Sequence, residues 1–151
     1  MRLFAIGNYI NQRLLWPFHE WLAKLLVSIP MDGTFNQLKP LNRLVPSWDC
    51  FSFDLKIKSA TDRWPLFYLR KLTQVLFGPE FASAAVHSAL GFNFLVVPFL
   101  KRKPLAALLV GQPLGYHASW PLFALSYHTT LWCGGVQNRS IQVNALTGMR
   151  C

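Results

Sequence analysis

The hydrophobic positions in the first thirty residues repeat at helical spacing. Apolar side chains recur at i, i+3, i+4 and i+7 and form one stripe of a helix: Leu14, Leu15, Phe18, Trp21, Leu22, Leu25 and Leu26. Pro17 lies inside this span, where a proline either opens the main helix at its first turn or kinks it. Pro30 and the turn at Asp32-Gly33 end the pattern. We therefore predict an amphipathic helix near residues 11–27.

Three later stretches also have helical character. Apolar residues follow helical spacing over residues 64–77, and Gly78 is a natural stop because glycine accepts a left-handed C-terminal cap. Pro79 favours the first turn of a following helix over residues 79–90. Ser119 can cap or open a helix and precedes another apolar stretch, so we expect a last helix over residues 119–131.

Two short segments have the character of strands. Cys50–Leu55 alternates, with Phe51 and Phe53 on one face, and Leu105–Val110 is an apolar run that suits a buried strand. Strand and helix signals alternate without a regular βαβ period. The sequence therefore predicts an α+β fold in which a few strands are covered on one side by the helices. The tail, Cys133–Cys151, loses apolar periodicity and is expected to be loop or weak strand that packs poorly.

Composition narrows the class of protein. The 151 residues include 15 Lys+Arg against 6 Asp+Glu, which gives a formal net charge of +9, and 52% of them are hydrophobic. This hydrophobic content excludes intrinsic disorder of the whole chain. The basic excess suits nucleic acid, an anionic membrane surface or another acidic ligand.

Membrane insertion and metal binding are not indicated. Residues 81–100 are uncharged, but polar residues and Pro98 interrupt them, so we expect no integral membrane span. The basic, acid-poor N-terminus has a faint transit-peptide character, and an ordinary amphipathic helix is the favoured interpretation. The three cysteines and four histidines lack the spacing of a disulfide framework or a metal site.

Two segments hold residues that could act on phosphate-bearing ligands. Asp54 ends the first predicted strand and Asp62 enters the next helix, where carboxylate oxygens can coordinate Mg²⁺. An aspartate at a strand end is more often a turn or helix-cap residue than a metal ligand. The segment from Gly111 to Trp120 has the pattern of a strand end, a glycine loop and a helix start, which can present N–H groups to a sugar–phosphate chain. It lacks the P-loop signature, and a plain turn into a helix is the alternative.

Four ordered motifs together indicate a family. They are RLFAIGNY (Arg2–Tyr9), MDGTFNQLKP (Met31–Pro40), Asp54 with SATDR (Ser59–Arg63), and GQPLGYHASW (Gly111–Trp120). Over about residues 2–132 the chain closely resembles a piece of a mitovirus RNA-dependent RNA polymerase, of the kind endogenised in plant mitochondrial genomes. The resemblance implies a mitochondrial location and a partial right-hand polymerase palm, with an incomplete sheet and a fingers-derived helix.

The resemblance also implies roles for individual residues. Arg2 would end the fingers motif that grips the incoming nucleotide triphosphate, since guanidinium suits phosphate. Asp54 would bind the catalytic metal, and Asp62 would help select the ribose 2′-hydroxyl. The palm loop and helix that hold template and nucleotide are matched by Gly111, Gly115 and Ser119. His128 lies on the helix after that loop, and we expect a structural role for it.

Two departures from the family argue against catalysis. Seven residues separate Asp54 from Asp62, two more than in the family, as though Lys56-Ile57 were inserted. Two extended residues displace an atom by about 6–7 Å. The 151 residues also contain no Gly-Asp-Asp, which carries the second metal aspartate in the family. The sequence therefore predicts a degenerate, inactive polymerase fragment. Mg²⁺ is the cofactor of the parent family, with only a vestigial site at Asp54, and no cofactor is expected here.

The resemblance divides the chain into three parts. Residues 1–48 are a fingers-derived segment with its connector, residues 49–132 a partial palm with motifs A and B, and residues 133–151 a tail outside the family. We expect weak RNA binding without sequence preference, and no protein partner is indicated. Two alternatives remain. An active polymerase would need a second chain to supply Gly-Asp-Asp and the thumb, whereas a basic RNA-binding or membrane-surface protein would do no chemistry.

Overall fold

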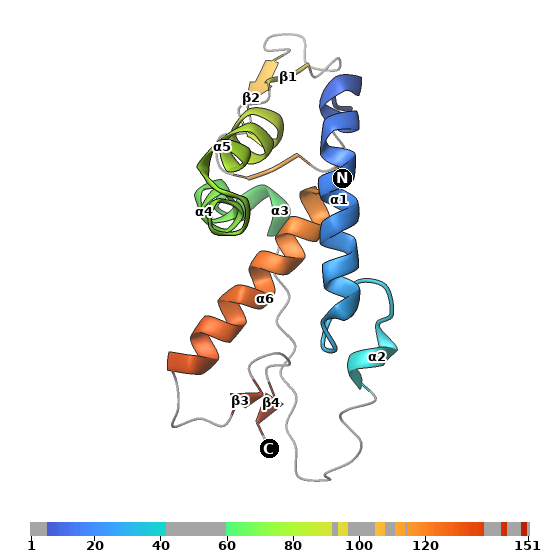
Figure 1. Ribbon diagram of the computed structural model, residues 1–151, viewed down its shortest axis with the longest axis vertical. Helices are drawn as coiled ribbons and strands as arrows, with labels where there is room; N and C mark the ends of the chain where they lie inside the picture. Colours follow the sequence, from blue (N-terminus) through green and yellow to red (C-terminus); the bar gives the residue numbers. More distant parts are fainter. Residues whose placement is uncertain are drawn as a thin grey trace.

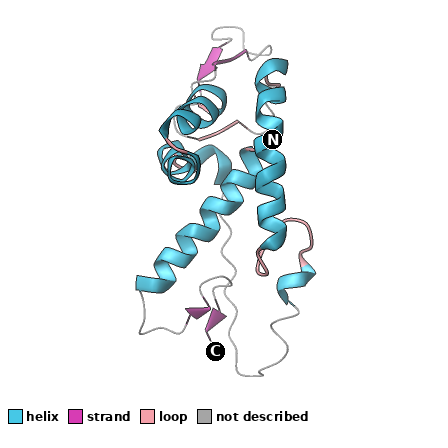
Figure 2. Cartoon of the chain, in the orientation of Figure 1, coloured by secondary structure: helices cyan, strands magenta, loops and turns pink. Residues whose placement is uncertain are grey.

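The computed structural model describes residues 6–41, 60–91, 94–96, 105–107, 111–113, 115–137, 143–144 and 149–150. Helices predominate among them (Figure 2). The helices are α1 (Tyr9–Ser28), α2 (Leu38–Leu41), α3 (Ala60–Arg63), α4 (Leu66–Phe77), α5 (Pro79–Ala82), the π-helix η2 (Ser83–Leu90) and α6 (Ser119–Gln137). The strands are β1 (Phe94–Val96), β2 (Leu105–Ala107), β3 (Val143–Asn144) and β4 (Met149–Arg150).

Helix α1 confirms the first predicted helix and begins slightly earlier. Asn8 caps it, because its Oδ1 accepts a hydrogen bond from the N–H of Ile10 at 2.8 Å. Pro17 lies inside the helix, so it does not open it. The stripe that α1 buries consists of Leu15, Phe18, Leu22 and Leu26. Leu14, which the pattern placed on the same stripe, is 73% exposed.

The predicted stop after the next long helix is also present. Gly78 has a φ of 88°, in the left-handed region, and its N–H donates to the carbonyl of Gln74 at 2.9 Å. The helix that follows begins as α5 and continues as the π-helix η2. There the N–H of Gly91 donates to the carbonyl of Val86, five residues back, at 2.7 Å.

The core lies where α1, α4, η2 and α6 meet. Figure 1 shows the start of α6 beside the middle of α1, with α4 and α5 to the left of α1 in this view. Phe77 at the end of α4 and Phe81 of α5 pack against Phe18 of α1. The buried apolar cluster is Leu15, Phe18, Leu22, Leu26, Ile29, Leu69, Ala85, Val86, Leu90, Tyr116, Ala118, Leu122, Ala124 and Leu125. Its members come from these helices, their ends and the turn before α6, so the apolar stripes of the helices bury one another.

The predicted α+β palm with a partial sheet is wrong for the described residues. β1 pairs antiparallel with β2, and β3 with β4, as two separate two-stranded pairs. The predicted strand Leu105–Val110 is present as β2 over its first three residues, and the predicted strand Cys50–Leu55 lies outside the described residues. Such short pairs offer little apolar surface for helices to cover, and the described core is formed by helix against helix.

Helix α6 extends further than its sequence pattern predicted. It continues through Gln137, so residues 133–137 are helical and not loop. Two glycines lie in this last part, but the penalty for glycine in a helix, about 1 kcal/mol each, is a weak preference that tertiary contacts override. Trp132 packs against the core just before them. Among the described residues, no helix combines the length and apolar character needed to cross a membrane.

Candidate functional site

The turn before α6 is tied to α1 by side chains of that helix. The Nε2 of Gln12 donates to the carbonyl of Gly115 at 2.9 Å, and its Oε1 accepts from the N–H of His117 at 2.8 Å. The Nδ1 of His19 accepts from the N–H of Ala118 at 3.1 Å. Because these bonds satisfy backbone groups of the turn, they hold α1 and the turn, about a hundred residues apart in the chain, in one arrangement.

The backbone of this turn has an unusual shape. Gly115 has a φ of 103° and Ala118 a φ of 65°, both in the left-handed region. For alanine that conformation costs about 1 kcal/mol or more, so the surrounding structure must impose it. Gly7 contributes by its lack of a side chain, because a Cβ there would lie 2.7 Å from the ring of Tyr116. The turn is therefore closely fitted to the N-terminal side of α1.

The beginning of the loop is tied to α3. The N–H of Gln112 donates to the carbonyl of Thr61 at 3.1 Å. The Nε2 of Gln112 donates to the carbonyl of Ser119 at 2.7 Å, and the Ser119 hydroxyl donates to the carbonyl of Pro113 at 3.2 Å. These two bonds join the ends of the loop and close it on itself. Gln112 and Ser119 are both buried, where a hydrogen-bond partner is needed.

Four of the residues singled out from the sequence lie in these segments. Gly111 and Ser119 are buried, and Gly115 is exposed at the turn. Asp62 belongs to α3, next to the Thr61 carbonyl that meets the loop. The structure thus brings the backbone of α3 together with the start of the loop, and the roles assigned to these residues remain predictions.

The predicted nucleotide and metal residues Arg2 and Asp54 lie outside the described residues. Within the described ranges, no group of three or more histidine, cysteine, aspartate or glutamate side chains is placed to hold a metal ion. The metal role of Asp54 therefore remains a prediction.

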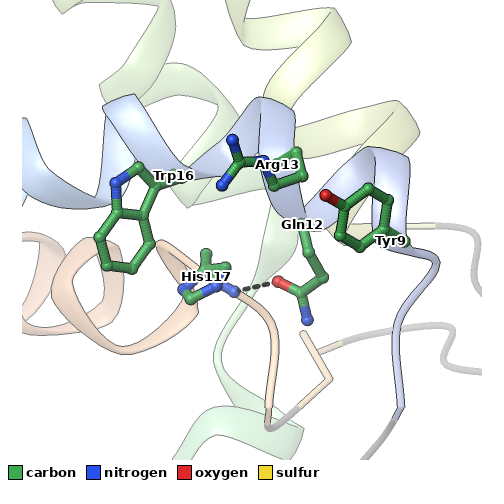
Figure 3. Close-up of a pocket in the computed structure, with 5 residues that line it drawn as sticks. All are labelled: Tyr9, Gln12, Arg13, Trp16 and His117. Atoms are coloured by element: carbon green, nitrogen blue, oxygen red, sulfur yellow. Dashed lines mark hydrogen bonds between the residues drawn. The ribbon is translucent and has the colours of Figure 1, made fainter.

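A groove of about 300 Å³ lies between α1 and the turn (Figure 3). Its lining consists of Tyr9, Gln12, Arg13, Trp16 and His117. Tyr9 and Trp16 are 75% and 44% exposed. Sequence reasoning missed this site because it followed only the apolar stripe. The available signal was the spacing of Tyr9, Gln12, Arg13 and Trp16, which lie at i, i+3, i+4 and i+7 on another face.

Aromatic and imidazole rings form one wall of this groove. Trp16 stacks on His19 with ring centroids 5.8 Å apart, and meets His117 edge-on at 4.9 Å. Burial and the neighbouring His117 lower the pKa of His19 below its usual value, against a smaller opposite effect of Glu20. The hydrogen bond from Ala118 requires an Nδ1 without a proton, which is the case in the neutral tautomer that carries its proton on Nε2.

A second contact joins the segment after α1 to α6. The Oδ2 of Asp32 lies 2.8 Å from the Nε2 of His128, and both side chains are buried. Asp32 also accepts from the N–H of Thr34 at 2.9 Å and from its hydroxyl at 3.1 Å. The His128 ring stacks on Trp132 at 5.8 Å. These contacts agree with the structural role that the sequence analysis expected for His128.

Comparison with known proteins confirms the resemblance. Residues 1–138 match the family described as mitovirus RNA-dependent RNA polymerase. The chain is 29% identical over 132 residues to the RNA-directed RNA polymerase of Cryphonectria parasitica mitovirus 1, covering 84% of this chain and 15% of that protein. No solved structure matches the chain.

Two relatives from Arabidopsis thaliana are uncharacterized mitochondrial proteins. One is 54% identical over 107 residues, covering 69% of this chain and 52% of the relative. The other is 39% identical over 114 residues, covering 75% of this chain and 45% of the relative. The chain thus spans about half the length of these relatives, and their mitochondrial location agrees with the location that the resemblance implied.

Proposed function

The chain belongs to the mitovirus RNA-dependent RNA polymerase family, and from this premise we propose that it is a catalytically inactive, mitochondrial derivative that binds RNA without sequence preference. The division into a fingers-derived segment (1–48), a partial palm (49–132) and a tail (133–151) is part of this proposal. So are the nucleotide and template roles of Arg2, Asp62, Gly111, Gly115 and Ser119.

The proposed loss of catalysis rests on the carboxylates. Metal-dependent phosphoryl transfer needs two carboxylate-bearing motifs that share the metal ions. The 151 residues contain no Gly-Asp-Asp, and the interval between Asp54 and Asp62 exceeds that of the family by two residues. Deleting Lys56-Ile57 would restore the interval and still leave the second motif missing. That deletion is therefore expected to restore no activity.

The observation that supports RNA binding is the turn before α6, held in a defined shape by α1. Gln12 and His19 bond three backbone groups of that turn. In the parent family the corresponding loop holds the template. The same junction exposes aromatic and cationic side chains, in a chain whose net charge of +9 favours phosphate.

Two assays on the purified 151-residue chain test the proposal. With a primed RNA template, nucleotides and Mg²⁺, we expect no incorporation. With a labelled RNA of about 20 nucleotides, we expect retention that weakens steeply between roughly 50 and 200 mM salt, because bound phosphates release counterions. Incorporation that Asp54→Asn abolishes would overturn the loss of catalysis. Absence of RNA retention at the lower salt concentration would overturn RNA binding.

A further inference from the structure

We propose that the groove between α1 and the turn before α6 is a site for one unpaired nucleotide of single-stranded RNA, with the base against Trp16 and the phosphate at Arg13. The inference rests on the proposed RNA-binding function and assigns a place and a ligand chemistry to it. Four of the five lining side chains come from α1, and His117 comes from the turn (Figure 3).

The spacing along α1 puts a cation between two aromatic rings. Tyr9 and Trp16 are seven residues apart, which is about 10 Å along a helix axis. Arg13 lies between them on the same face, as Figure 3 shows. Exposed aromatic faces beside a guanidinium are the combination that holds single-stranded nucleic acid, because every base has a π-face and every nucleotide a phosphate.

The ring of Trp16 is positioned before any ligand binds. It is stacked on His19 and meets the edge of His117, and 44% of its surface is still exposed. His117 is in turn fixed through its N–H by Gln12, and His19 by the N–H of Ala118. A ring held in this way loses little conformational freedom on binding, which favours stacking of a base on its exposed part.

The electrostatics of the groove favour a phosphate. Among the described residues, its lining includes Arg13 and no carboxylate. Within the described part of the chain, the contact between a basic and an acidic side chain joins His128 to Asp32, far along the sequence from Arg13. No described carboxylate therefore neutralises this guanidinium, which remains available for a charge-assisted contact with a phosphate.

The hydrogen bonds of Gln12 bear on specificity. Its amide nitrogen and oxygen, the groups that could read the edge of a base, are both bonded to the backbone of the turn. Besides the Tyr9 hydroxyl and the His117 imidazole, the groove offers mainly stacking surfaces and a cation, and neither of these distinguishes one base from another strongly. Binding in this groove is thus expected to be nearly independent of base identity.

Fluorescence anisotropy with labelled oligo(A), oligo(U) and an abasic oligomer of equal length tests the site, using the full 151-residue chain. Trp16→Leu is expected to weaken binding of oligo(A) and oligo(U) about tenfold and to leave the abasic oligomer unaffected, because only base stacking is lost. Trp21→Leu is the matched control, since Trp21 lies on the same helix, is 41% exposed and packs on Phe77 outside the groove. It should bind as the unmodified chain does.

The proposed contact between Arg13 and a phosphate is tested against a control variant that removes the same charge elsewhere on α1. Arg13→Gln and Lys24→Gln each remove one positive charge from an exposed position on α1, but only Arg13 lines the groove. Arg13→Gln is expected to weaken binding of all three oligomers and to reduce the salt dependence by about one phosphate. Lys24→Gln should change neither. Circular dichroism and urea unfolding of each variant verify that the fold is retained.

The outcomes separate the site from the function. The unmodified chain could bind RNA while each groove variant binds it as tightly as its control, Trp16→Leu as Trp21→Leu and Arg13→Gln as Lys24→Gln. That result would overturn the groove as the site and leave the proposed function standing. No RNA binding by the unmodified chain would overturn both. Vesicles of phosphatidylcholine and cardiolipin form a further arm, and variants that weaken vesicle binding but not RNA binding would also overturn the proposed nucleotide site.

Discussion

Replacing Asp32 by alanine is expected to destabilise the protein severely. Asp32 is 7% exposed and accepts three hydrogen bonds, two from Thr34 and one involving the Nε2 of His128. The Nδ1 of His128 is buried without a described hydrogen-bond partner. Asp32→Ala would therefore leave both nitrogens of a buried imidazole unsatisfied, in addition to the lost bonds of Thr34.

The size of the effect follows from this loss. Leaving one buried polar group unsatisfied costs about 1–3 kcal/mol, and Asp32→Ala affects the Nε2 of His128 and both donors of Thr34, so we expect a total of about 3–5 kcal/mol. The total stability of a typical domain is about 5–15 kcal/mol. Since about 1 kcal/mol shifts the melting temperature of a chain of this length by roughly 2–4 °C, we expect Asp32→Ala to lower it by roughly 6–20 °C. Asp32→Asn, which keeps the shape and an acceptor, should cost clearly less.

Urea unfolding followed by tryptophan fluorescence measures these changes, and the stacking of Trp132 on His128 places a reporter beside the pair. A double-mutant cycle of Asp32→Asn with His128→Gln isolates the coupling, which we expect to be about 1–3 kcal/mol. A cost below about 1 kcal/mol for Asp32→Ala would refute the reasoning, because a loss that small is typical of a solvent-exposed pair.

Three further predictions follow from other parts of the structure. Gly7→Ala should cost about 1–3 kcal/mol in urea unfolding, because its Cβ would lie 2.7 Å from the Tyr116 ring, while Gly134→Ala, with nothing within 4 Å, should have no such cost. The pKa of His19 is lowered in the folded state. The contribution of His19 to stability is therefore complete above the unfolded pKa of 6.5 and is lost as the pH falls below that value. In urea unfolding at several pH values, His19→Gln should flatten this part of the stability–pH profile. The net charge of +9 opposes self-association at low salt, so light scattering should detect aggregation as salt screens it, and a scattering signal that falls with salt would contradict this.

The local pattern of the sequence was enough to locate the long helices, but not the short helices α2 and α3. The stripe at residues 11–27 and the stop at Gly78 are present in the structure because helix periodicity and glycine caps depend on neighbouring residues. Family membership was also readable, since motif order along the chain needs no coordinates. The α+β fold that the sequence predicted was wrong for the described residues. Whether an apolar run pairs with a distant strand is decided by the segments that meet it in space, and the described core is formed by helices.

The candidate site depended on tertiary structure. Gln12 and His117 are 105 residues apart, and Asp32 and His128 are 96 apart. Each of these residues taken singly is an ordinary polar residue on a helix or in a loop, and the sequence alone showed only that Arg13 and Trp16 share a helical face. Packing of α1 against the turn before α6 makes that face a groove, because hydrogen bonds between distant segments form only after the chain has folded.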